Sequence, residues 1–215
     1  KHAAQKHLHR TQTPQRSYII RLEMSSVADN ITHLRSQLPP EVVLVAVSKT
    51  KPLEDLQTAY DAGQRDFGEN RVQEMAEKHA ALPKDIRWHM IGHVQTNKIK
   101  EFAPWIHLVH GVDRIKVLEV LETEAAKAGR AVDALLQVHI AQEETKFGFS
   151  SEELIPLLTR TALQAYPNVR IRGLMGMASF TPNQQQVARE FAELRALFLA
   201  GKEQLGLDYL DTLSM

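Results

Sequence analysis

The sequence predicts an α/β fold, a TIM-type (β/α)8 barrel. Short apolar runs alternate without a break with helical patterns from residue 42 onward. Several of these runs, such as VVLVAV and ALLQVHI, have no polar face, which is typical of parallel strands covered by helices. No G-x-G-x-x-G motif and no Walker lysine follows the first run, so a doubly wound nucleotide-binding sheet lacks its best marker. A small barrel is therefore the favoured architecture.

The expected strands are defined by their apolar character and by the helical segments that separate them. The first, residues 42–47, is apolar throughout, so we expect it to be buried on both faces. The expected strands are residues 42–47, 65–68, 88–92, 107–112, 134–141 and 171–178, with a seventh that begins at Tyr209.

The helices between these strands are predicted from apolar spacing and from capping residues. Ser25 or Ser26 is expected to cap a first helix. Ser150 and Glu153 form a capping box, which opens a helix over residues 152–165. The other expected helices lie in residues 53–63, 70–82, 95–103 and 113–130, the last ended by Gly129, and in a segment from residue 181 onward, with Thr181 as N-cap and Pro182 at the first helical position.

Composition excludes several classes of site and partner. Basic and acidic residues balance at 26 each, so there is no polybasic argument for a nucleic acid or a membrane surface. The absence of cysteine excludes disulfides, thiolate metal sites and cysteine nucleophiles. No apolar run approaches the length of a membrane span. A cytoplasmic protein without nucleic-acid or membrane partners is expected.

The two ends of the sequence carry expectations of their own. Residues 1–23 are basic, contain three histidines and lack the apolar centre of a signal peptide. We expect a tag or an upstream leader there, with a mitochondrial presequence as the alternative, and one domain over residues 24–215. The final letters YLDTLSM stop inside a strand pattern, so the rest of strand seven and strand eight are expected to be missing from this sequence.

Polar residues follow most of the expected strands, where barrel sites form. We expect these side chains to converge on one mouth of the barrel. They are Ser48, Lys49, Thr50, Glu69, Asn70, His89, Gly92, His93, His110, Asp113, Lys146, residues 175–179 and Ser214.

Lys49 is the strongest candidate for chemistry in this set. A lysine at the end of an apolar strand is expected to be partly desolvated, which lowers its pKa, and Lys51 would act in the same direction. Such an amine forms Schiff bases with carbonyl groups, including the aldehyde of pyridoxal phosphate. An ordinary lysine that reaches out to solvent fits the pattern as well. Pattern alone leaves both interpretations open.

Metal and hydrolase sites are less well supported. His89 and His93 are four residues apart across a strand end, which does not place them on one face, and no carboxylate or third histidine has a persuasive spacing. We therefore expect no metal. No G-x-S-x-G segment marks a serine nucleophile.

Five segments carry a family resemblance. AVSKTKP, AGQRDFGENRVQE, WHMIGHVQTNK, IRGLMGMA and LSM follow one another in order, and together they resemble the pyridoxal phosphate homeostasis protein family. The resemblance covers residues 24–215. It implies a single-domain barrel of the alanine racemase N-terminal type, with pyridoxal 5′-phosphate (PLP) held as a Schiff base on Lys49.

The resemblance also implies roles for residues other than Lys49. Asn70 would face the cofactor, while His89 would either line the same mouth or serve structure alone. Lys146 would approach the phenolate side of the ring, and Met175 would pack at the ring. Ser214 matches the opening of the phosphate-binding segment.

Two functions follow from these expectations. The resemblance implies a monomeric PLP carrier or regulator in vitamin B6 homeostasis, without established catalysis, that could pass the cofactor to apo-enzymes. The alternative is a PLP-dependent, racemase-like enzyme, which needs an acid/base group on each face of the bound substrate. The four tyrosines, at positions 18, 60, 166 and 209, show no motif that places one opposite Lys49, so the carrier is favoured.

Overall fold

The computed structural model of the protein describes residues 26–142, 147–205 and 210–215. Its strands are β1 Ala46–Val47, β2 Asp66–Glu69, β3 Arg87–Met90, β4 Leu108–Val112, β5 Val132–Val138, β6 Val169–Gly176 and β7 Thr212–Ser214. Its helices are α1 Val27–Gln37, α2 Leu53–Asp61, α3 Val72–Ala81, α4 Ile99–Phe102, α5 Ile115–Lys127, α6 Ser151–Leu157, α7 Arg160–Gln164 and α8 Gln184–Leu205, with a 3₁₀ turn at Thr96–Lys98.

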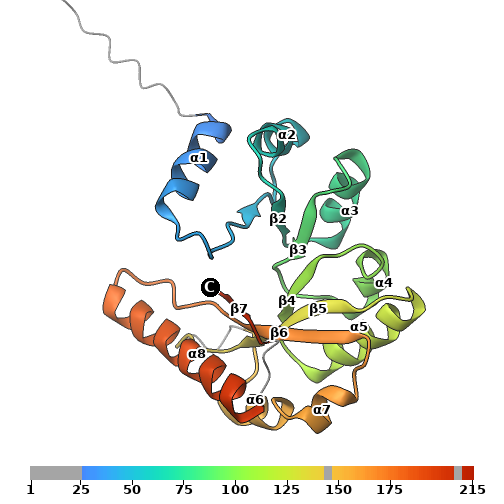
Figure 1. Cartoon of the computed structure of the whole chain (residues 1–215), viewed down its shortest axis with the longest axis vertical. Helices are drawn as coiled ribbons and strands as arrows, with labels where there is room; N and C mark the ends of the chain where they lie inside the picture. Colours follow the sequence, from blue (N-terminus) through green and yellow to red (C-terminus); the bar gives the residue numbers. More distant parts are fainter. Residues whose placement is uncertain (1–25, 143–146, 206–209) are drawn as a thin grey trace, which may run out of the picture.

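The strands form one parallel sheet whose spatial order equals their order in the sequence, β1 to β7. Figure 1 shows the sheet curling, with helices on its outer side. This arrangement is the one expected when each strand is followed by a helix that returns the chain to the next parallel strand. The predicted barrel-type α/β fold is confirmed as a curled, open sheet.

Burial follows from this arrangement. Every residue of β2 and β4 is buried, because helices cover one face of these strands and the curled sheet encloses the other. The main core lies between sheet and helices and contains Phe67, Trp88 and Met90. A separate small cluster is formed by Leu108, Leu135 and Met175.

The first strand differs from its prediction. β1 has two residues, and Val42, Val43 and Val47 are 47%, 64% and 52% exposed. In the described part of the chain β1 pairs only with β2, and β7 only with β6. The expected burial on both faces is therefore wrong, because an edge strand lacks the second neighbour that would cover it.

The predicted helix over residues 152–165 is also wrong in its length. Its capping box between Ser150 and Glu153 is confirmed, but the segment divides into α6 and α7. Pro156 lacks the amide hydrogen that the helix needs, and the Thr159 side chain accepts a hydrogen bond from the Ala162 amide, which starts a new helix.

The predictions for the other helix ends are confirmed in part. Ser26 caps α1, and Gly129, with φ of +64°, follows the end of α5. The prediction that Thr181 caps the last helix is wrong. Asn183 Oδ1 accepts from the Gln186 amide at 3.2 Å, and α8 begins at Gln184.

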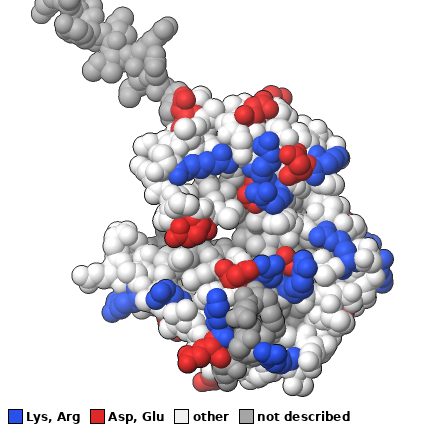
Figure 2. Space-filling model, in the orientation of Figure 1, with Lys and Arg blue, Asp and Glu red and all other residues white. Residues whose placement is uncertain are grey.

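The surface shows no dominant sign of charge in the view of Figure 2, where basic and acidic side chains are interspersed. None of the described helices has the length and apolar character that a membrane span requires. The expected leader, residues 1–23, and Tyr209, the expected start of strand seven, lie outside the described residues.

Candidate functional site

Lys49 lies in a turn two residues beyond the end of β1, and it is exposed. The expectation that burial desolvates this lysine is therefore wrong. Ser48, directly after β1, is buried, but Lys49 and Thr50 are open to solvent. The structure instead presents a solvent-accessible amine at the carboxyl end of the first strand.

The backbone on both sides of Lys49 is fixed by hydrogen bonds. The Ser48 amide donates to Gly68 O at 3.0 Å, and the buried Ser48 hydroxyl donates to Glu69 Oε1 at 2.7 Å. The Thr50 amide donates to Glu74 Oε1 at 2.6 Å, and Thr50 has a φ of +62°, an uncommon conformation for a residue other than glycine. The lysine side chain thus projects from a rigid turn.

Lys78, from α3, joins these contacts into one buried network. Its Nζ donates to Ser48 O at 2.7 Å, Glu69 Oε1 at 2.7 Å and Glu74 Oε1 at 2.6 Å. Burial alone would lower the pKa of Lys78, but the hydrogen bonds to the two carboxylates outweigh it and raise the pKa above its ordinary value. We call Ser48, Glu69, Glu74 and Lys78 the lysine clamp, because they hold the turn that carries Lys49.

Asn70 follows the last residue of β2 and is half-buried. Its backbone packs closely against Gly92, where an added Cβ would lie 2.7 Å from Asn70 Cα and 2.8 Å from Asn70 O. Only a glycine at position 92 permits this approach. Gly92 therefore determines where Asn70 can sit at the end of β2.

Gly92→Ala is expected to push the Asn70 backbone away from β3. Overpacking of this kind lowers the free energy of unfolding by about 1–3 kcal/mol. Urea unfolding measures that loss. Gly129→Ala is the comparison variant, because nothing lies within 4 Å of its added Cβ and any loss there comes from the positive φ alone. A ligand that contacts Asn70 should bind more weakly to Gly92→Ala than to wild type. Equal affinity of the two proteins for such a ligand would contradict the role of Gly92 in positioning Asn70.

His89 is buried and lies within a chain of hydrogen bonds that crosses four strands. Its Nε2 is 3.0 Å from Asp66 Oδ1, and its Nδ1 is 2.9 Å from His110 Nε2. His110 Nδ1 is in turn 2.9 Å from Ser214 Oγ. We call these four residues the histidine chain. It joins His89, His110 and Ser214, three of the strand-end residues expected to converge, to Asp66, which was not among them.

The charge states in the histidine chain follow from its surroundings. Burial would raise the pKa of Asp66, but hydrogen bonds from Arg87 and His89 hold it well below its ordinary value, so Asp66 is a carboxylate. Burial, together with the charges of His89 and His107, lowers the pKa of His110 to about 3. His110 is therefore neutral at physiological pH.

This shift of His110 predicts a pH-dependent stability. Between pH 6.5, its ordinary pKa, and the native value of about 3, the native state binds fewer protons than the unfolded state. The free energy of unfolding is therefore expected to rise with pH in this window, by about 1.4 kcal/mol per pH unit from this group. Urea unfolding at several pH values measures the slope, and His110→Asn should reduce it. An unchanged slope in that variant would contradict the assignment.

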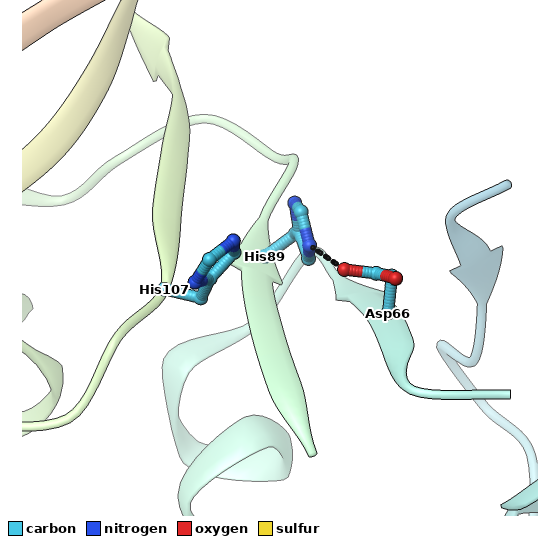
Figure 3. Close-up of side chains that lie close together, drawn as sticks. All are labelled: Asp66, His89 and His107. Carbon is cyan, nitrogen blue, oxygen red and sulfur yellow. Dashed lines mark hydrogen bonds and ion pairs between the residues drawn. The ribbon is translucent and has the colours of Figure 1, made fainter. Parts of the chain in front are cut away.

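Figure 3 shows the His89 ring between His107 and Asp66. Ligand atoms of these three residues lie within 4.8 Å of one another, so the fold assembles a group that the sequence spacing did not indicate. Both Asp66 oxygens, however, accept hydrogen bonds from Arg87, and both His89 ring nitrogens are engaged in the histidine chain. The expectation that the protein holds no metal stays a prediction.

The remaining predicted site residues lie on the last strands. Met175 and Ser214 are Cα partners in the pairing of β6 with β7. Met175 is 4% exposed and packs with Leu108 and Leu135. Lys146 lies outside the described residues, so its expected role remains a prediction.

Several residues of the site could not have been found by motif. Glu74 and Lys78 have the spacing of an ordinary helical ion pair, which is usually solvent-exposed, and the packing of α3 on β2 and β3 buries the Lys78 end of the pair. His93 and Asp113, in contrast, were both among the strand-end residues expected to converge, and they meet: His93 Nδ1 is 2.7 Å from Oδ2 of the buried Asp113, and the His93 ring stacks on Phe147.

Comparison with known proteins gives a consistent result. The family model of the alanine racemase N-terminal domain matches residues 22–212. A pyridoxal phosphate homeostasis protein of Pseudomonas aeruginosa is 38% identical over 203 residues, which cover 89% of this chain and 85% of the relative. Another, from Synechocystis sp., is 38% identical over 182 residues, which cover 83% of this chain and 81% of the relative.

Solved structures agree with the sequence comparison. PipY of Synechococcus elongatus, with PLP bound, is 36% identical, has a TM-score of 0.80 and is covered to 88% in both chains. Alanine racemase of Bartonella henselae, with covalently bound pyridoxal phosphate, has a TM-score of 0.64 at 18% identity, with coverage of 83% of this chain and 51% of the racemase. At that identity the likeness shows the fold alone.

Proposed function

The chain belongs to the pyridoxal phosphate homeostasis protein family, built on the alanine racemase N-terminal domain, and we propose that it binds PLP reversibly on Lys49. The observation that carries this proposal is an exposed lysine on a turn fixed by the lysine clamp. When bound, the cofactor supplies an aldehyde that forms a Schiff base with a lysine amine. An exposed lysine on a hydrogen-bonded turn suits that reaction, because the backbone that carries it is already ordered before the cofactor binds.

The described residues fit the other parts of this cofactor. Ser214 lies at the carboxyl end of β7, where barrels of this kind commonly bind phosphate, and its hydroxyl is a suitable ligand. Met175, its Cα partner on β6, is packed with Leu108 and Leu135, so a ring would meet only the small exposed part of this apolar side chain. Asn70 follows β2, the strand that pairs with β1, so its amide is placed for a polar contact near Lys49. We propose these three as the groups that surround the cofactor, with His89 acting through the histidine chain.

We further propose that the protein is a carrier in cytoplasmic PLP homeostasis, acting as a monomer and without catalysis. Two of its tyrosines support this. Tyr60 donates to Asp85, which precedes β3, and Tyr166 precedes β6, so both lie toward the amino ends of the strands, away from Lys49. Tyr18 and Tyr209 lie outside the described residues.

The carrier function is tested by transfer of the cofactor. The PLP-loaded protein is mixed with an apo-enzyme that needs PLP, and the recovery of that enzyme's activity is compared with recovery in free PLP at the same concentration. A carrier is expected to restore activity while the free cofactor is kept low by a trapping reagent. Recovery that stops completely when the trap is present would contradict direct transfer.

A second candidate function is a racemase-like enzyme, and one observation favours it. Asp113 forms an ion pair with Arg114. As a carboxylate, Asp113 would accept a hydrogen bond from His93 Nδ1–H, and His93 Nε2 would then be the ring nitrogen that can act as a base at the carboxyl ends of β3 and β4. Incubation of the PLP-loaded protein with L-alanine and other amino acids in D₂O tests this. Deuterium at Cα above the free-cofactor background, lost in His93→Gln, would favour the enzyme over the carrier.

A further inference from the structure

The histidine chain fixes the direction in which the Ser214 hydroxyl points its proton. Asp66 is a carboxylate and can only accept, so His89 Nε2 must carry a proton. In the state where His89 Nδ1 carries no proton, it accepts from His110 Nε2–H. His110 Nδ1 has no proton left and accepts from the Ser214 hydroxyl. Each hydrogen bond is thus directed toward Asp66, and Ser214 Oγ presents only lone pairs to its other side.

This direction conflicts with the role proposed for Ser214. A phosphate dianion offers only acceptor oxygens, so it needs a donor, and a serine hydroxyl has one proton. Ser214 cannot donate to His110 and to phosphate at the same time. Phosphate bound at Ser214 therefore requires the direction of the histidine chain to reverse.

One added proton reverses the whole chain. A proton from solvent on His89 Nδ1 makes that ring a donor to His110 Nε2, beside the negative charge of Asp66. His110 passes to its other neutral tautomer and donates from Nδ1 to Ser214 Oγ, which frees the hydroxyl proton for the phosphate. The low pKa of His110 agrees with this, because His110 stays neutral in both states. Only the bonds to the exchanged protons form and break, and every other covalent bond is unchanged.

We propose that the histidine chain couples phosphate recognition at Ser214 to the uptake of one proton, with His89 and His110 as positioning residues. This inference rests on the proposed function, since it takes the phosphate of the cofactor as the ligand of Ser214. The other charged or titratable groups around this pair are Arg87, which donates to Asp66, and His107, just before β4, which acts on His110; Arg87 and Asp133 on β5 act in turn on His107. Arg87 is hydrogen-bonded to both oxygens of Asp66, at the end of the path, whereas His107 contacts His89 only through its ring.

Isothermal titration calorimetry with pyridoxine 5′-phosphate tests the coupling. This ligand carries the ring and the phosphate but no aldehyde, so Lys49 chemistry does not contribute protons. At pH 8 its phosphate is a dianion, because the second phosphate pKa is about 6. The slope of the binding enthalpy against the ionisation enthalpy of the buffer gives the protons taken up. We expect about one proton for wild type and about none for Ser214→Ala.

His107→Asn is the matched control, because His107 contacts the His89 ring but lies outside the chain; it should keep the wild-type uptake. In ¹⁵N spectra of histidine-labelled protein, His110 should change from the Nε2–H to the Nδ1–H tautomer when the ligand binds. Equal uptake in wild type and Ser214→Ala, or an unchanged His110 tautomer, would overturn the inference.

The failure of this inference can be distinguished from failure of the proposed function. Pyridoxine 5′-phosphate that binds without proton uptake overturns only the coupling. A wild-type protein that binds neither pyridoxine 5′-phosphate nor PLP overturns both. The calorimetric slope and the tautomer are also independent of any enzymatic activity of the loaded protein.

Discussion

Lys49→Ala is expected to abolish the visible absorbance band that a Schiff base with PLP produces. The reason is chemical, since alanine offers no amine to the aldehyde. The fold should be kept, because Lys49 is exposed and its side chain takes no part in the lysine clamp. Absorbance spectra of both proteins during titration with PLP measure the effect, and the band is expected to fall to the background of free PLP.

Lys51→Ala is the matched control for this experiment. Lys51 is also exposed and lies two residues further along the same segment, so it shares the charge and surroundings of Lys49 without its position at the turn. The control should keep the full band. A band that survives in Lys49→Ala, or that disappears equally in Lys51→Ala, would place the reactive amine elsewhere.

Lys78→Met is expected to cause the largest loss of stability. The Glu69 side chain is completely buried, and Lys78 is the cation that compensates it. Within the described residues Glu69 Oε2 has no hydrogen-bond partner, and the Ser48 hydroxyl that donates to Oε1 is neutral, so it does not replace the charge of the lysine. Breaking a buried pair in this way lowers the free energy of unfolding by roughly 3–5 kcal/mol.

Chemical unfolding, followed by circular dichroism, measures this loss. Lys100→Met on α4 removes an exposed lysine and should stay within about 0.5 kcal/mol of wild type. The double variant Glu69→Gln, Lys78→Met should recover part of the loss, because no buried charge is left without its partner. An equal loss in Lys78→Met and Lys100→Met would show that the clamp contributes nothing.

Lys78→Met should also weaken the site itself. The lysine holds Ser48 O, and through Glu74 it fixes the Thr50 amide, so the turn around Lys49 loses two supports at once. PLP binding to the folded fraction of the variant, measured by the Schiff-base band under stabilising conditions, should be weaker than in wild type. Unchanged binding would mean that the clamp serves stability alone.

The alternation of strands and helices could be predicted because periodicity is a local property of the sequence. The predicted ranges of β4 and α5 agree closely with the observed ones. Lys49, which follows the first apolar run, was expected at the end of a strand and lies there. Burial of that run could not be predicted, since it depends on the neighbours of β1 in the sheet. The break between α6 and α7 was missed although Pro156 and Thr159 are local signals.

The contacts that support the site could not be predicted from patterns in the sequence. The histidine chain joins residues from β2, β3, β4 and β7, and the lysine clamp joins β1, β2 and α3. Both depend on the register of neighbouring strands, which fixes which side chains lie opposite one another. For this reason no sequence pattern singled out Asp66 or Lys78.

The attachment of PLP to Lys49 is tested most directly by chemical trapping. The PLP-loaded protein is reduced with borohydride, which converts a Schiff base into a stable secondary amine, and the modified peptide is identified by mass spectrometry after proteolysis. We predict one phosphopyridoxyl group on the peptide that contains Lys49, assigned to that residue by fragmentation. A modification spread over several lysines, or located on a different one, would contradict the central claim.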